Sequence, residues 1–109
     1  MVRGSWWLEA LVLAAIVPSL GPSAAAESPT AQRQTELRRL LDHDCGSCHG
    51  LTRRGGLGPA LSAIALDERD DDSLVDTILN GRRGTPMAPW GFELTRSEAR
   101  WLVDLMRGR

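Results

Sequence analysis

Apolar side chains recur at helical spacing in several segments of this chain, and no segment shows the alternation typical of a β-strand. The first such segment covers residues 31–44. Within it, Leu37, Leu40 and Leu41 fall at positions i, i+3 and i+4 on one helical face. We therefore predict an N-terminal helix that leads directly into Cys45.

Two further helical segments are predicted in the middle of the chain. The longer one begins with Asp72 or Ser73 as its N-cap and ends at Asn80-Gly81, a pair that often terminates helices. Between these limits lies an apolar stripe, which consists of Leu74, Val75, Ile78 and Leu79. A shorter helical stretch is predicted for residues 60–66.

The last helix is predicted from about Arg96 to Met106. Thr95 and Glu98 have the spacing of a capping box, in which each residue bonds to the backbone of the other. An apolar face follows, made of Trp101, Leu102, Leu105 and Met106. These patterns predict an all-α protein with three to five helices.

The first 26 residues have the features of an export signal. Arg3 gives a short positive start, residues 8–17 are mostly apolar, and residues 24–26 are three alanines suited to cleavage. The apolar stretch is shorter than the ~20 residues that a spanning helix needs. We expect cleavage after Ala26 and a periplasmic protein, although the acidic Glu9 leaves an uncleaved anchor as the alternative.

Removal of the signal leaves residues 27–109, which form one small domain. Trp90, Phe92 and Trp101 are its only aromatic side chains, so its core needs another source of apolar surface. The formal net charge is −1, and all thirteen basic residues are arginines. Because no nucleic-acid-binding motif accompanies these arginines, we expect no nucleic-acid partner.

The sequence Cys45-Gly46-Ser47-Cys48-His49 has the C-x-x-C-H spacing at which two thiols and an imidazole bind one haem. A redox-active dithiol, half of a zinc site and a plain disulfide are the alternatives. Zinc is disfavoured because His43 is the only other His or Cys in the chain. A redox dithiol is disfavoured because a helical pattern, and no strand, precedes the motif.

A second candidate ligand lies in the loop of residues 81–91, which is rich in Gly and Pro. Met87 is flanked by Pro86 and Pro89, so its thioether is well placed to reach the open face of a haem iron. Met106 lies on the apolar face of the last helix, where packing explains it. We predict Met87 as the distal ligand, with packing of Met87 in the core as the alternative.

The order of these features resembles that of class I cytochromes c over residues 27–109. The resemblance implies that the first and last helices cross and pack beside one covalently bound haem c. It further implies that the carbonyl of Pro59 accepts the proton of the proximal imidazole. The residues that match the family's haem-binding positions are Cys45 and Cys48 for the thioethers, His49 for the proximal ligand and Met87 for the distal ligand.

Four segments are similar to the small 55X-type cytochrome c of denitrifying bacteria, which accompanies the nitrite reductase that contains haem c and haem d. This resemblance implies a one-electron carrier that donates electrons to nitrite reductase. We expect no enzyme activity, such as that of a peroxidase, because an iron bound by Met87 has no vacant site for a substrate. The alternatives are a role in maturation of the special haem of that reductase and donation to another periplasmic or membrane oxidoreductase. We expect a monomer that is not bound to the membrane after signal cleavage. The similar segments are residues 45–52, 55–61, 78–82 and 84–90.

Charged residues cluster by sign along the chain. Four arginines adjoin the two ligand motifs and are expected near the exposed haem edge: Arg53, Arg54, Arg82 and Arg83. Five acids fall between the middle helical segments: Asp67, Glu68, Asp70, Asp71 and Asp72. This asymmetry predicts attraction of the haem edge to an acidic redox partner. The alternative is a solvated acidic turn that caps a helix, together with incidental surface arginines.

Overall fold

The computed structural model describes Gly21 and residues 27–109, and the latter form helices joined by loops, with no strand among them. The all-α prediction is therefore confirmed. The predicted signal sequence, residues 1–26, lies outside the described part of the chain except for Gly21. No helix within residues 27–109 combines the length and apolar character needed to cross a bilayer. The elements are α1 (Ala31–Leu40), the π-helical segment η1 (Leu41–Cys45), α2 (Gly46–His49), α3 (Asp71–Asn80) and α4 (Arg96–Arg107).

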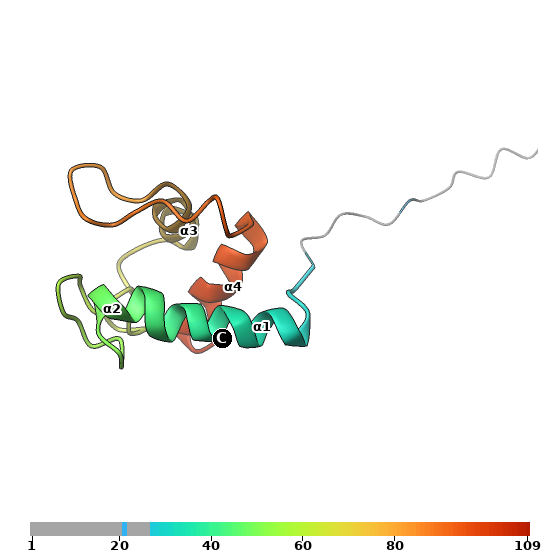
Figure 1. Ribbon diagram of the computed structural model, residues 1–109, viewed down its shortest axis with the longest axis horizontal. Coiled ribbons are helices and arrows are strands. Elements are labelled where there is room, and N and C mark those ends of the chain that lie inside the picture. The colour runs from blue at the N-terminus through green and yellow to red at the C-terminus, as the bar shows by residue number, and fades with distance from the viewer. Residues whose placement is uncertain (1–20, 22–26) are drawn as a thin grey trace, which may run out of the picture.

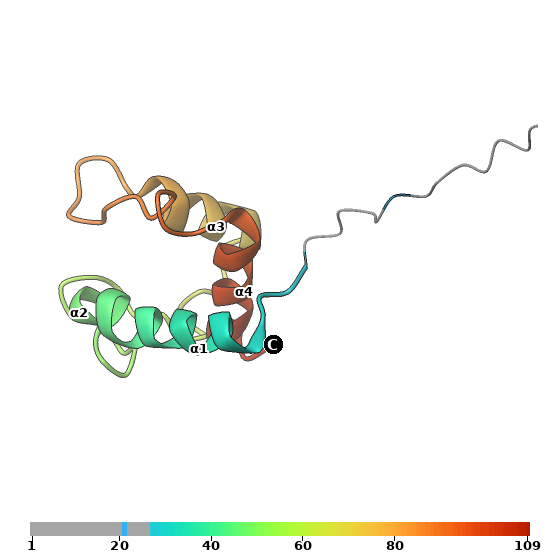
Figure 2. The same ribbon diagram turned by 45° about the vertical axis from the view of Figure 1, so that its right-hand side comes forward.

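The helices form three sides of an open frame. α1, η1 and α2 follow one another along one side, α3 lies opposite, and α4 joins the two sides at one end (Figure 1). Figure 2 shows that the loop after α2 and the loop after α3 project at the opposite end from α4. The two segments predicted to hold a haem thus face each other from separate sides of the frame.

The N-terminal helix differs from the prediction of one α-helix over residues 31–44. Its N-cap is Thr30, whose hydroxyl accepts a hydrogen bond from the amide of Arg33 at 3.3 Å. The α-helix ends at Leu40, and the backbone continues as η1, where the amide of Gly46 donates to the carbonyl of Leu41. One residue is therefore added to a turn directly before the C-x-x-C-H motif, a type of distortion that occurs frequently at functional sites.

The core lies where the N-terminal helix meets α4. Leu37, Leu41 and Leu102 are each at most 1% exposed and belong to one cluster of buried side chains. Trp101 packs against this cluster, and the guanidinium carbon of Arg38 lies 5.2 Å from the centre of its ring. The predicted packing of the first helix against the last is thus confirmed.

Caps account for the limits of α3 and α4. The prediction of Asp72 or Ser73 as the N-cap of α3 is wrong, because the carboxylate of Asp70 accepts from the amide of Ser73 at 2.8 Å and the helix begins at Asp71. The end at Asn80 agrees with the prediction. The capping box of α4 is confirmed, and this helix runs one residue beyond the predicted end, to Arg107.

The predicted helix over residues 60–66 is also wrong, because this segment consists of successive turns. The hydroxyl of Ser62 accepts a hydrogen bond from the amide of Ala65, which favours a turn over a continuing helix. Leu66 is buried, whereas Ile64 is 90% exposed. The segment therefore lacks the buried face that stabilises a short helix.

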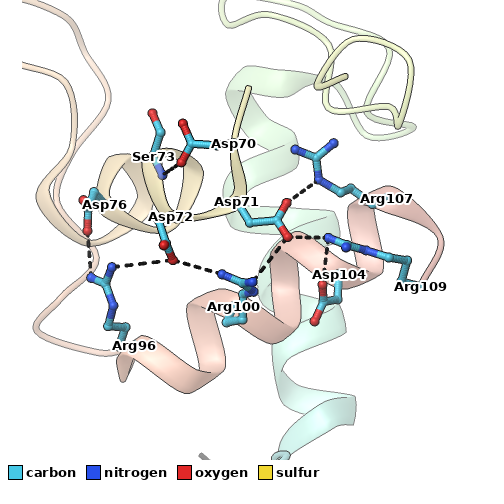
Figure 3. Close-up of polar contacts among 10 residues, drawn as sticks. All are labelled: Asp70, Asp71, Asp72, Ser73, Asp76, Arg96, Arg100, Asp104, Arg107 and Arg109. Carbon is cyan, nitrogen blue, oxygen red and sulfur yellow. Dashed lines mark hydrogen bonds and ion pairs between the residues drawn. The ribbon is translucent and has the colours of Figure 1, made fainter. Parts of the chain in front are cut away.

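The acidic segment at the start of α3 is paired with arginines of α4 (Figure 3). Asp71 lies 2.7 Å from Arg107 and 2.6 Å from Arg109. The guanidinium of Arg109, and next that of Arg107, holds the pKa of the Asp71 carboxyl below its usual range. Asp71 therefore joins the first turn of α3 to the end of α4.

Two more ion pairs extend this contact along α4. Asp72 lies 3.0 Å from Arg100, and Asp76 lies 2.7 Å from Arg96 (Figure 3). Exposed pairs of this kind each contribute at most about 1 kcal/mol to the free energy of unfolding. Their chief effect is therefore to fix how α3 and α4 align. The acids at the start of α3 are thus partly neutralised within the molecule, which favours the capping and pairing interpretation of this segment.

Candidate haem site

A cavity of about 520 Å³ lies between the C-x-x-C-H segment and the loop that follows α3. This volume is within the range of cofactor pockets. The lining is mainly apolar and includes Leu41, Leu61, Leu74, Ile78 and Leu102. All five residues predicted for the haem site line this one cavity: Cys45, Cys48, His49, Pro59 and Met87.

The two cysteines lie at the junction of η1 and α2, and neither forms a disulfide. Burial raises the pKa of the Cys45 thiol to about 11, and the neighbouring charge of Asp44 raises it further in the same direction. Redox-active Cys-x-x-Cys pairs instead have a lowered thiol pKa. The surroundings of Cys45 therefore disfavour the dithiol alternative and fit a thiol held against an apolar cavity.

His49 ends α2 and is fixed by the turn that follows it. Its Nδ1 lies 2.7 Å from the carbonyl oxygen of Pro59. Because a carbonyl can only accept, Nδ1 carries the proton and Nε2 keeps its lone pair. The contact expected for Pro59 is thus present in the structure, and it leaves Nε2 as the nitrogen able to bind a metal.

Gly58 is a positioning residue that the sequence did not single out for this role. A Cβ at this position would lie 2.9 Å from both Cε1 and Nδ1 of the His49 ring. The amide of Gly58 also donates to the carbonyl of Cys48 at 2.8 Å. Gly58 therefore allows the turn to pack flat against the imidazole, and the Gly-Pro pair in the sequence was the signal for it.

The loop that carries Met87 is anchored at both ends on α3. The amide of Gly81 donates to the carbonyl of Thr77 at 2.9 Å, and the amide of Trp90 donates to the carbonyl of Ile78 at 3.0 Å. Within the loop, the amide of Arg82 donates to the carbonyl of Met87 at 3.2 Å. Gly81 has φ 69° and ψ −169°, and a Cβ there would lie 2.6 Å from the carbonyl oxygen of Met87. Only glycine fits this conformation without strain, so Gly81 sets the path of the loop.

Met106 also lines the cavity, although its side chain is 9% exposed and belongs to the core cluster. It extends from α4, the helix that joins the two sides of the frame. Met87 instead extends from the loop opposite the C-x-x-C-H segment. The two thioethers thus reach the cavity from different elements.

The four arginines near the ligand motifs do not form one uniform patch. Arg53 lies 3.2 Å from Asp42 and forms an ion pair with it. Arg54, Arg82 and Arg83 are all exposed, and of these three only Arg82 lines the cavity. The position of the four arginines near the haem edge stays a prediction, and among them only Arg82 lines the cavity.

The residues present fit a haem. The cavity has a large apolar lining, two thiols at the C-x-x-C-H spacing and an imidazole whose Nε2 is available. A thioether lies on the loop across the cavity. Zinc would need further thiolate or imidazole ligands, and no group of three or more His, Cys, Asp or Glu side chains within residues 27–109 is arranged to hold a metal.

Known proteins support the same interpretation. The family model described as cytochrome c oxidase, cbb3-type, subunit III, matches residues 32–106. Cytochrome c55X of Pseudomonas aeruginosa is 52% identical over 99 residues, which are 91% of this chain and 80% of that protein. Cytochrome c55X of Paracoccus denitrificans is 48% identical over 94 residues, which are 86% of this chain and 91% of that protein.

Solved structures add a match at the level of the fold. A c-type cytochrome NirC has a TM-score of 0.72 and 54% identity, covering 73% of this chain and 94% of that one. Dihydro-haem d1 dehydrogenase NirN in complex with DHE has a TM-score of 0.60 and 33% identity, covering 64% of this chain and 15% of that one. This chain therefore belongs to the small c-type cytochromes of the 55X type, and its cofactor is one covalently bound haem c.

Proposed function

We propose that this cytochrome is a periplasmic one-electron carrier that donates electrons to nitrite reductase. The observation that carries the proposal is that His49 and Met87 line one apolar cavity from elements on opposite sides of the frame. A haem held between them would be bound by both side chains. No position on the iron would then be left for a substrate, which favours electron transfer over catalysis at the iron.

In this proposal, each residue of the site has a separate task. Cys45 and Cys48 would hold the haem through thioether bonds, and His49 would bind it through Nε2 because Pro59 engages Nδ1. Met87 would supply its thioether to the iron from the loop across the cavity. The bound haem supplies an iron that takes up and releases one electron. The apolar lining excludes water, and together with a Met ligand this raises the reduction potential.

Export to the periplasm is part of the proposal. Residues 1–26 have the pattern of a cleavable signal, and residues 27–109 are proposed as the mature cytochrome domain. Such a signal directs a protein to a compartment in which disulfides can form. N-terminal sequencing of the protein from a periplasmic fraction tests this step, and we expect a mature chain that begins at Glu27.

The choice of partner is supported by the relatives. Two cytochromes c55X and a NirC structure match most of this chain. The resemblance of the sequence to the 55X type implies that the protein accompanies nitrite reductase. Stopped-flow mixing of the reduced protein with oxidised nitrite reductase tests the proposal. We expect the cytochrome to become oxidised at a rate proportional to enzyme concentration. Absence of oxidation at every enzyme concentration would contradict donation to this enzyme.

A second candidate is a role in maturation of the special haem of the reductase. The match to dihydro-haem d1 dehydrogenase NirN favours it, because a segment of that enzyme is 33% identical to 64% of this chain. Deletion of the gene separates the two functions. A maturation role predicts nitrite reductase without its special haem, whereas an electron-carrier role predicts a complete enzyme that lacks its donor.

A further inference from the structure

Among the arginines of residues 27–109, Arg82 is the one that lines the haem cavity. The other ionisable lining residues within residues 27–109 are Asp44, Cys45, Cys48 and His49, and the last three belong to haem attachment. Asp44 is an anion on the η1 side of the cavity, whereas Arg82 lies at the start of the loop that carries Met87. The cavity therefore has a positive group on one side only.

The guanidinium of Arg82 has no hydrogen-bond or ion-pair partner among residues 27–109. This differs from Arg53, which is paired with Asp42, and from the arginines of α4, which are paired with acids of α3. Its backbone, by contrast, is held firmly. The amide donates to Met87, and the carbonyl accepts from both the amide and the hydroxyl of Thr85, at 3.1 and 2.7 Å.

Other side-chain donors that line the cavity are already engaged. The hydroxyl of Thr77 donates to the carbonyl of Ser73, and that of Ser47 donates to the carbonyl of Asp44. The indole N–H of Trp90 is the remaining side-chain N–H, and it carries no charge. Arg82 is thus the lining group best suited to an anion.

A haem carries two propionate groups, which are anions at neutral pH. An anion against an apolar wall is costly unless a charged group pairs with it, and a guanidinium binds a carboxylate through two parallel hydrogen bonds. We propose that Arg82 binds a propionate of the haem and so fixes that edge of the cofactor to the base of the Met87 loop. This inference rests on the proposed haem site.

The test compares Arg82→Gln with Arg83→Gln in the holoprotein. Arg83 is adjacent and, like Arg82, exposed, but it does not line the cavity, so it controls for loss of one positive charge. Resonance Raman spectra report the propionate bending band, and redox titration reports the reduction potential. We expect Arg82→Gln to shift the band and lower the potential, because a cation beside the haem favours the reduced iron. Arg83→Gln should leave the band in place.

Arg82→Lys keeps the charge but loses the paired hydrogen bonds, so its potential should lie between those of the wild type and Arg82→Gln. An unchanged band in Arg82→Gln, or equal shifts in Arg82→Gln and Arg83→Gln, would overturn the inference while the proposed function stands. An intact mass without haem in the wild-type protein would overturn both.

Discussion

At the scale of single residues, the proximal side of the site depends on contacts around one imidazole. Pro59 orients the ring of His49 through its carbonyl, and Gly58 leaves room for the ring to lie against the turn. The proline carbonyl was expected from the resemblance to class I cytochromes c. The role of Gly58 was not, because close packing of a backbone against a ring depends on three-dimensional contacts.

Gly58→Ala should disturb the His49 ring, because the added methyl would lie 2.9 Å from two of its atoms. We expect a loss of about 1–3 kcal/mol in the free energy of unfolding, as is typical of overpacking. Loss of the bond to Pro59 should also raise the reduction potential, because the imidazole becomes a weaker donor to the iron. Denaturant unfolding and redox titration measure the two effects.

Gly46→Ala, in the C-x-x-C-H motif itself, is the control for the added methyl group. A Cβ there meets its nearest neighbour at 3.5 Å, an ordinary contact, and the residue is helical. We expect unchanged or slightly increased stability. If Gly46→Ala destabilises the protein as much as Gly58→Ala does, packing against the imidazole is not the cause.

At the scale of elements, the loop after α3 depends on how it leaves the helix. Gly81 ends α3 in a conformation that is essentially restricted to glycine, and it brings the chain back against Met87 and Pro89. Gly84, in the same loop, also has a positive φ, but a Cβ there would meet nothing within 4 Å. Substitutions at Gly81 and Gly84 can therefore separate the effect of backbone strain from the effect of a close contact.

Gly81→Ala should displace the loop, because the new methyl would clash with the backbone of Met87. Backbone strain costs about 1–3 kcal/mol in both variants, so both should unfold more easily than the wild type. Only Gly81→Ala should also weaken the Met-to-iron(III) absorption band at long wavelength. A normal band in Gly81→Ala would show that the loop tolerates the contact.

The elements that the sequence predicted well are those whose limits are local. Thr95 with Glu98, and Asn80 with Gly81, mark helix ends through bonds to their own neighbours. The π-helical turn over Leu41–Cys45 has no such local signal. The segment of residues 60–66 contains good helix formers, but a short helix needs a buried face, and Ile64 is exposed.

At the scale of the whole molecule, ion pairs join elements that are far apart in the sequence. The carboxylate of Glu98 on α4 lies 2.6 Å from Arg33 on α1 and is 15% exposed. The hydrogen bond from Arg33 holds the pKa of the Glu98 carboxyl below its usual value. The sequence identified the cap that Glu98 forms, but the partner across the fold depends on how α1 and α4 cross.

This pairing predicts a dependence of stability on pH. Because the pKa of Glu98 is lower in the folded state, its stabilising effect is complete above the unfolded value of about 4.3. The effect is lost as pH falls through the folded value. Glu98→Gln retains a cap acceptor but loses the charge, so it should be less stable than the wild type near neutral pH.

Denaturant unfolding of both proteins at about pH 7 and about pH 2.5 checks this expectation. The difference in unfolding free energy should be present at the higher pH and disappear at the lower one. An equal difference at both values would mean that charge pairing with Arg33 does not contribute.

The distribution of charge also predicts the kinetics of docking. The acids of α3 are largely paired with α4, whereas Arg54 and Arg83 are exposed beside the segments that form the cavity. Attraction to an acidic partner is screened as the Debye length falls from ~10 Å at 0.1 M salt to ~3 Å at 1 M. The second-order rate of electron transfer should therefore fall as salt increases.

Replacing Arg54 and Arg83 together by Gln should slow this step and reduce its dependence on salt. Arg39→Gln is the control, since Arg39 is exposed but lines a separate groove with Glu36. Stopped-flow oxidation by nitrite reductase measures all three proteins. A rate that is insensitive to salt and to the double substitution would contradict electrostatic steering.

The proposed function requires that His49 and Met87 close both faces of the haem iron, so that the protein transfers electrons and binds no substrate there. The most direct measurement is the Met-to-iron(III) absorption band of the oxidised protein in Met87→Ala and Met106→Ala. We expect Met87→Ala to lose the band and to have a lower reduction potential, because a Met ligand raises it. Met106→Ala should keep the band. Loss of the band in Met106→Ala together with its retention in Met87→Ala would contradict the account.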